Sequence, residues 1–186
     1  MEQQLKSLAK SARWYRKAHR FVALPLVAFL FIMGTTGLLL AWKDEFKLKP
    51  PTATIEVKGN ALISLDSIKN NAITHIENSG LSSEIDRIDY RPNKGIAKVI
   101  FTDHFTELQI DCYTGNIISE QTRTADVIEM IHDGSIIDFI FKNSSKPAKL
   151  FYSTLTSLSL MFLAFSGFWL WLKPRQIKSI KSNSTK

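Results

Sequence analysis

The chain has 186 residues, of which 45% are hydrophobic, with 24 basic and 17 acidic side chains. That length suits one small domain with accessory segments, and the composition excludes a disordered or collagen-like chain. The apolar residues are unevenly distributed, because residues 21–42 and 151–172 each form a stretch of 22 residues without a charge. These two stretches predict two membrane-spanning helices. The 43–150 loop between them is too small for the large catalytic domain of most soluble enzymes.

The net charge of +7 comes from the two short ends of the chain. Residues 1–20 and residues 173–186 each have a net charge of +5, whereas the loop has a net charge of −3. Basic residues beside a membrane span favour the cytoplasmic side. We therefore expect both ends in the cytoplasm and residues 43–150 outside it. Because the surplus charge is a topology signal, we expect the lipid bilayer and not a nucleic acid as the partner.

The two ends of the first span have separate patterns. Residues 1–20 place apolar and basic side chains on adjoining faces at helical spacing, which predicts an amphipathic helix on an anionic membrane surface. Near the other end, Gly34 and Gly37 offer a small-residue surface on which another helix can pack closely. Gly167 in the second span is the expected counterpart of that surface.

The loop begins with a predicted strand at Thr54–Val57. Ser64 then has the position of a helix N-cap, with an apolar stripe following it and Gly80 as the stop. Three strands of an antiparallel meander follow, at Ile85–Tyr90, at Ile96–Phe101, and around Leu108, Ile110 and Cys112. After them come a short helix from Thr124 and an apolar patch at Ile136–Phe141, expected on the outer membrane surface or in the domain core. The expected fold class is therefore an α+β membrane protein in which two transmembrane helices flank one helix packed on an antiparallel sheet.

Few side chains outside the spans indicate chemistry. Cys112 is the only cysteine, so the chain has no internal disulfide, and the strand alternation predicts that Cys112 is buried. His75 and His104 are expected to be solvated. The sequence has no phosphate-binding loop, no nucleophile with a plausible triad, no paired zinc-ligand spacing and no dinucleotide fingerprint. A flavin or nicotinamide site is therefore not expected, and the catalytic residues of any reaction are unknown from the sequence.

The motifs at the ends of the loop carry a family resemblance. Residues 108–118 (LQIDCYTGNII) resemble the last strand and return strand of a PepSY domain. The segments 18–20 (AHR), 36–42 (TGLLLAW), 131–134 (IHDG) and 167–175 (GFWLWLKPR) resemble the PepSY-associated transmembrane family. The resemblance covers nearly the whole chain. It implies a small two-span member of that family, in the inner membrane of a bacterium, with a periplasmic PepSY-like domain.

Larger members of that family include reductases that pass electrons to ferric-siderophore complexes through b-type haems bound by histidine. The resemblance implies that His19 and His132 match the family histidines that border the spans, which makes them candidate axial ligands of haem b. A 22-residue span rises about 33 Å, so the two histidines of one chain cannot bind the same iron. A symmetric homodimer would place each histidine near its own copy. Asp133 is then a candidate partner for the second nitrogen of His132.

Two hypotheses for the function remain open at this point. In the first, the chain is a small b-type cytochrome, or the membrane subunit of one, that transfers electrons in iron uptake. In the second, it is a membrane-tethered PepSY module that binds or regulates a periplasmic protein, and its histidines are structural. The first predicts bound haem and a homodimer or partner subunit, whereas the second predicts no cofactor.

Overall fold

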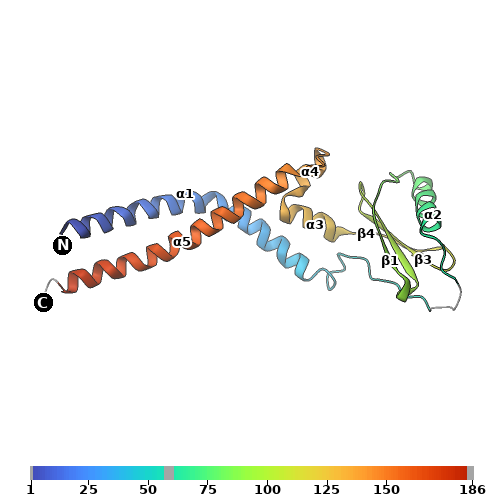
Figure 1. Cartoon of the computed structure of the whole chain (residues 1–186), viewed down its shortest axis with the longest axis horizontal. Helices are drawn as coiled ribbons and strands as arrows, with labels where there is room; N and C mark the ends of the chain where they lie inside the picture. The colour runs from blue at the N-terminus through green and yellow to red at the C-terminus, as the bar shows by residue number, and fades with distance from the viewer. Residues whose placement is uncertain (1, 57–60, 184–186) are drawn as a thin grey trace. The chain divides into compact units, whose positions relative to one another are not determined.

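The computed structural model describes residues 2–56 and 61–183. The predicted fold class is confirmed, because two long apolar helices flank a four-stranded antiparallel sheet with short helices (Figure 1). The chain divides into two compact units. We call Met1–Gly37 with Ile131–Lys186 the helix unit, and Leu38–Met130 the sheet unit. In order, the elements are α1 (Glu2–Ala41), α2 (Leu65–Asn78), β1 (Ile85–Arg91), a 3-10 turn η1 (Pro92–Lys94), β2 (Ile96–Phe101), β3 (Thr106–Asp111), β4 (Ile117–Thr122), α3 (Thr124–Asp133), α4 (Ser135–Ile140) and α5 (Pro147–Asn183).

The helix unit is built on α1 and α5, which pack antiparallel. Both are long and apolar enough to cross a membrane, with candidate spans at Lys6–Ala41 and Pro147–Ile180. The ring of Tyr15 lies 5.4 Å from that of Trp169, and the ring of Phe29 lies 5.8 Å from that of Tyr152. The predicted amphipathic head and the first span form one uninterrupted helix, which continues through Pro25.

A tight corner at Gly134 joins the end of α3 to α4 within the helix unit. Gly134 has φ +80°, and a Cβ at this position would lie 2.8 Å from the Tyr152 ring, so both the turn and the packing require glycine here. The predicted apolar patch forms α4, whose Asp138 is buried. The Asp138 carboxylate accepts the backbone N–H groups of Ala148 and Lys149 at 2.9 and 2.8 Å. This carboxylate satisfies amides of the first turn of α5, which have no partner inside the helix.

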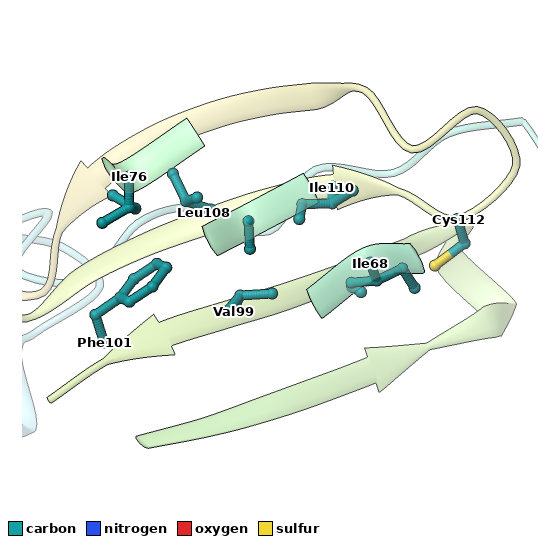
Figure 2. Close-up of a cluster of buried hydrophobic side chains, with 9 residues drawn as sticks. Ile68, Ile76, Val99, Phe101, Leu108, Ile110 and Cys112 are labelled. Carbon is teal, nitrogen blue, oxygen red and sulfur yellow. The ribbon is translucent and has the colours of Figure 1, made fainter. Parts of the chain in front are cut away.

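The sheet unit has its apolar core between α2 and one face of the sheet. The strands pair in the order β1-β2-β3-β4, and in this register Val99 is opposite Leu108 and Ala97 is opposite Ile110. Figure 2 shows the side chains of α2 lying over those of β2 and β3. The predicted N-cap is confirmed, because the Ser64 hydroxyl accepts the Ser67 N–H. The buried cluster consists of Ile68, Ala72, Ile76, Ala97, Val99, Phe101, Leu108, Ile110 and Cys112.

The prediction of a strand at Thr54–Val57 was wrong for residues 54–56, and Val57 lies outside the described residues. Residues 53–55 make isolated hydrogen bonds to the sheet unit and not the regular backbone pairing of a strand. Ala53 N–H donates to the Gln109 side chain at 2.8 Å, and Ile55 N–H donates to the Lys94 carbonyl at 3.0 Å. The two prolines that precede it, Pro50 and Pro51, have no N–H to donate, which interrupts regular strand pairing.

Candidate functional site

His19 lies on α1 and faces α5. Its Nδ1 is 2.7 Å from the hydroxyl oxygen of Ser166. The ring also lies against Gly167, which follows Ser166 on α5, because a Cβ built on Gly167 would lie 3.7 Å from His19 Cε1. Ser166 is almost completely buried. The imidazole of His19 therefore packs against the Ser166 hydroxyl and the Gly167 backbone of α5.

His132 lies in the last turn of α3 and faces α1 in the same way. Its Nδ1 is 2.9 Å from the Thr36 hydroxyl oxygen, and a Cβ on Gly37 would lie 3.4 Å from His132 Cε1. In both places a histidine packs on a hydroxyl residue followed by glycine. Two of the glycines predicted to form a helix-packing surface thus face imidazole rings, whereas a Cβ on Gly34 would meet nothing within 4 Å among the described residues.

Both hydroxyl groups lie against the Nδ1 atom of their histidine and also near a carbonyl oxygen of their own helix. The Thr36 hydroxyl lies 2.7 Å from the Ile32 carbonyl, and a carbonyl oxygen only accepts, so the hydroxyl proton goes there. The Thr36 oxygen must then accept from His132 Nδ1–H. The Ser166 hydroxyl lies 3.3 Å from the Leu163 carbonyl and closer, at 2.7 Å, to His19 Nδ1. Each histidine thus makes its hydrogen bond through Nδ1, and Nε2 is the ring nitrogen left without one among the described residues.

His19 and His132 are the residues of this site that could hold a haem iron. A neutral imidazole binds iron through one nitrogen while the other donates to an oxygen that orients the ring. Neither Nε2 atom has a hydrogen-bond partner among residues 2–56 and 61–183. One chain does not supply two ligands to one iron, however. His132 contacts Thr36, which is seventeen residues beyond His19 on α1, or about 25 Å along the helix.

Asp133 does not have the role that was predicted for it. It accepts the Ser135 N–H at 2.9 Å and pairs with Lys149 of α5, while Thr36 takes the place beside His132. Partial burial works against ionisation of Asp133, but Lys149 and Ser135 outweigh it and hold the pKa of this carboxyl below its ordinary value. The sequence neighbour of His132 therefore fastens α3 to α5 instead of orienting the imidazole.

The second face of the sheet carries buried charges that the sequence analysis missed. Glu107 is fully buried and lies between Lys98, whose Nζ is 2.7 Å from Glu107 Oε1, and Arg123, which binds Oε2. Arg123 also binds both carboxylate oxygens of Asp126. Gln109 donates to Glu107 and to the Pro51 carbonyl. We call Lys98, Glu107, Gln109, Arg123 and Asp126 the charged cluster.

A signal for the charged cluster was present in the sequence. Lys98 interrupts an otherwise apolar strand, and Glu107 and Gln109 alternate with Leu108 and Ile110. Period-two alternation usually indicates a solvated face. Here the segment from residue 48 to 55 covers that face, with Ala125 N–H donating to the Leu48 carbonyl at 2.8 Å. The pattern therefore showed which residues share a face but not that a linker buries them.

The other candidate residues have ordinary partners. His75 Nε2 pairs with Glu120 at 2.8 Å, and His104 bonds the Thr106 hydroxyl and the Ser82 carbonyl. Cys112 is buried as predicted, and that burial raises the pKa of its thiol. In the part of the chain that the structure describes, no three His, Cys, Asp or Glu side chains gather as a metal site would require.

The comparison with family models decides the family. The model of the PepSY-associated TM region matches residues 16–185, which include both histidines and both hydroxyl-glycine pairs. The chain belongs to this family. No curated protein matches it significantly. As a member of the PepSY-associated TM region family, the chain is a membrane protein, and its two candidate spans are the long helices α1 and α5.

Proposed function

We propose that this protein is a b-type haem electron-transfer protein that works as a homodimer in the bacterial inner membrane. The observation that carries the proposal is that both histidines bond a hydroxyl through Nδ1 and bond nothing through Nε2 among the described residues. Thr36 and Ser166 lie against the Nδ1 atoms of His132 and His19, so Nε2 is the nitrogen of each ring that could bind iron. A purely structural histidine needs no particular nitrogen to remain available, whereas an iron ligand does.

The distance between the histidines supports a dimer. A twofold axis along the membrane normal would bring His19 near its copy and His132 near its copy, giving one pair of ligands toward each membrane face. Haem bound at each pair would supply a one-electron carrier. The residues of the chain hold the imidazoles: the hydroxyls of Thr36 and Ser166 orient the rings, and the rings lie against Gly37 and Gly167.

The direction of transfer follows from the proposed topology. Both ends of the chain are in the cytoplasm and residues 43–150 are periplasmic, because the basic residues gather at the two ends. Electrons would pass outward to an iron substrate or a periplasmic partner, as in the siderophore reductases that the family includes. A reporter that is active only in the cytoplasm, inserted at residue 90, should be inactive, and full activity there would contradict the topology.

Haem content of histidine variants tests the proposal. His19→Ala and His132→Ala each remove one pair of ligands from the dimer, so each should retain about half of the haem per chain, and the double variant should retain none. His75→Ala and His104→Ala are matched controls, since these histidines bond Glu120 and Thr106, and they should retain all of it. Full haem in both ligand variants would overturn the assignment.

The hydroxyls provide a second test of the same site. Thr36→Val keeps the shape of the side chain but removes the acceptor of His132 Nδ1–H, so haem affinity should fall about tenfold or more. Thr36→Ser restores the acceptor and should restore the affinity. If the valine variant binds haem as tightly as the wild type, the Thr36 hydroxyl does not position His132 as an iron ligand.

A second function is favoured by a different observation. The sheet leaves β1 and β4 each paired on one side only among the described strands, and Ile118 of β4 is 40% exposed. Such edges accept an added strand from another protein. A membrane-tethered module that binds or regulates a periplasmic protein would use them. Folded protein without haem, made in cells with ample haem, would favour this function over electron transfer.

A further inference from the structure

One face of α1 near the start of the chain carries an unusual concentration of positive charge. Arg13, Arg16, Lys17 and Arg20 alone line an open hollow of about 200 Å³. Their spacing places them on one side of the helix. All four side chains are exposed, and none forms a salt bridge with a carboxylate among the side chains that the structure describes. Four cations that share a hollow repel one another unless an anion occupies it.

An apolar track continues the same side of α1. Leu24, Val27 and Phe31 follow Arg20 at helical spacing and are 81%, 62% and 74% exposed. On this side of α1, basic side chains are therefore followed by apolar side chains. An anionic phospholipid has a matching arrangement, because its charged phosphate is joined to apolar acyl chains.

The hollow lies at the level where lipid headgroups are expected. Trp14 and Tyr15 are beside it on α1, and Tyr15 contacts Trp169 of α5. Near that level the ammonium of Lys173 lies 4.1 Å from the centre of the Trp169 ring, and the Arg175 guanidinium lies 3.8 Å from that of Trp171. Aromatic rings with basic side chains beside them mark the membrane interface.

We propose that this face of α1 is a binding site for an anionic phospholipid of the leaflet nearest the chain termini. The phosphate occupies the hollow between the four cations, and an acyl chain lies along Leu24, Val27 and Phe31. A water-soluble phosphate compound would use the charges but leave the apolar track without an occupant. The site is independent of the histidines and of any haem.

Native mass spectrometry of the full chain tests the site directly. The detergent-solubilised protein is offered equal amounts of phosphatidylglycerol and phosphatidylcholine with the same acyl chains. The wild type should retain phosphatidylglycerol preferentially, and Arg16→Gln with Arg20→Gln should lower that preference about tenfold. Lys178→Gln with Lys181→Gln removes the same charge from the tail and should leave it within about twofold. An unchanged preference in the Arg16 and Arg20 variant, or an equal loss in the tail variant, would overturn the proposal.

Two further measurements separate the site from misfolding and from soluble anions. Arg16→Lys with Arg20→Lys keeps the charge and should keep most of the preference, so loss of binding in this variant would contradict the proposal. Inorganic phosphate at about 10 mM should leave the lipid bound, since phosphate gains nothing from the apolar track. Displacement of the lipid by inorganic phosphate would show that the hollow takes soluble anions and would overturn the lipid assignment.

Discussion

In the sheet unit nine buried apolar side chains form one core, whereas four of the seven buried residues that are described in the helix unit are polar. Those four are Thr36, Asp138, Thr156 and Ser166. In water, burial of apolar side chains stabilises a fold. Between membrane helices lipid already surrounds the apolar side chains, so small residues and hydrogen bonds decide the packing. The two units should therefore respond differently to the same kind of substitution.

The largest effect is expected in the charged cluster of the sheet unit. Glu107→Ala leaves Lys98 and Arg123 buried without their shared carboxylate, and removal of one partner from a buried ion pair costs about 3–5 kcal/mol. Hydrogen exchange of residues 96–112 in the full chain would measure this loss. Glu84→Ala is the matched control, because Glu84 is exposed. Equal protection of the two variants would mean that the charged cluster does not stabilise the sheet.

A slightly smaller effect is expected from the apolar face of the same sheet. Ile110→Ala leaves a cavity under α2 at a fully buried position and should destabilise the sheet unit by about 3 kcal/mol. Ile118→Ala removes the same atoms from a half-exposed position in β4 and should cost about 1 kcal/mol or less. Denaturant unfolding of the full chain compares the two variants, and equal costs would contradict the placement of the core.

The helix unit should be sensitive to a polar substitution. Asp138→Ala removes the acceptor of two N–H groups in the first turn of α5, which should cost about 2 kcal/mol. The loss should be local, so hydrogen exchange should accelerate at residues 147–150 and stay unchanged at residues 96–112. Asp44→Ala is the control at an exposed carboxylate. Unchanged exchange at the start of α5 would show that Asp138 does not hold this corner.

The smallest change in the stability of the sheet unit is expected when the pH is lowered. Arg91 binds Asp89 and lowers the pKa of this carboxyl below its ordinary value near 3.8. The stability that Asp89 contributes is therefore present above about pH 4 and is lost as the pH falls through the lowered pKa. Asp89→Asn should flatten the dependence of sheet unfolding on pH below that value. An identical acid profile of wild type and Asp89→Asn would contradict the pairing.

The sequence was most informative where one physical rule acts alone. The uncharged stretches predicted α1 and α5, and the cap at Ser64 predicted the start of α2. His19 and His132 were singled out, but their partners were not, because Thr36 and Ser166 lie far away in the sequence. The repeated hydroxyl-glycine pair was the available signal for those partners.

The errors arose where a neighbour in space overrides a local pattern. Asp133 was expected beside His132 because it follows it in the chain, but α5 brings Lys149 to it. Residues 54–56 alternate like a strand, but they cover the sheet without joining it. Glu107 alternates like a solvated residue, but a linker buries it. Long-range packing of this kind cannot be inferred from spacing alone.

The most direct test of the proposed function is a reduced-minus-oxidised visible spectrum of the purified wild-type protein in detergent, with haem quantified per chain. A homodimer with one pair of His19 and one pair of His132 ligands predicts a b-type spectrum and about one haem per chain. A folded protein made with ample haem that shows no such spectrum would contradict the electron-transfer function.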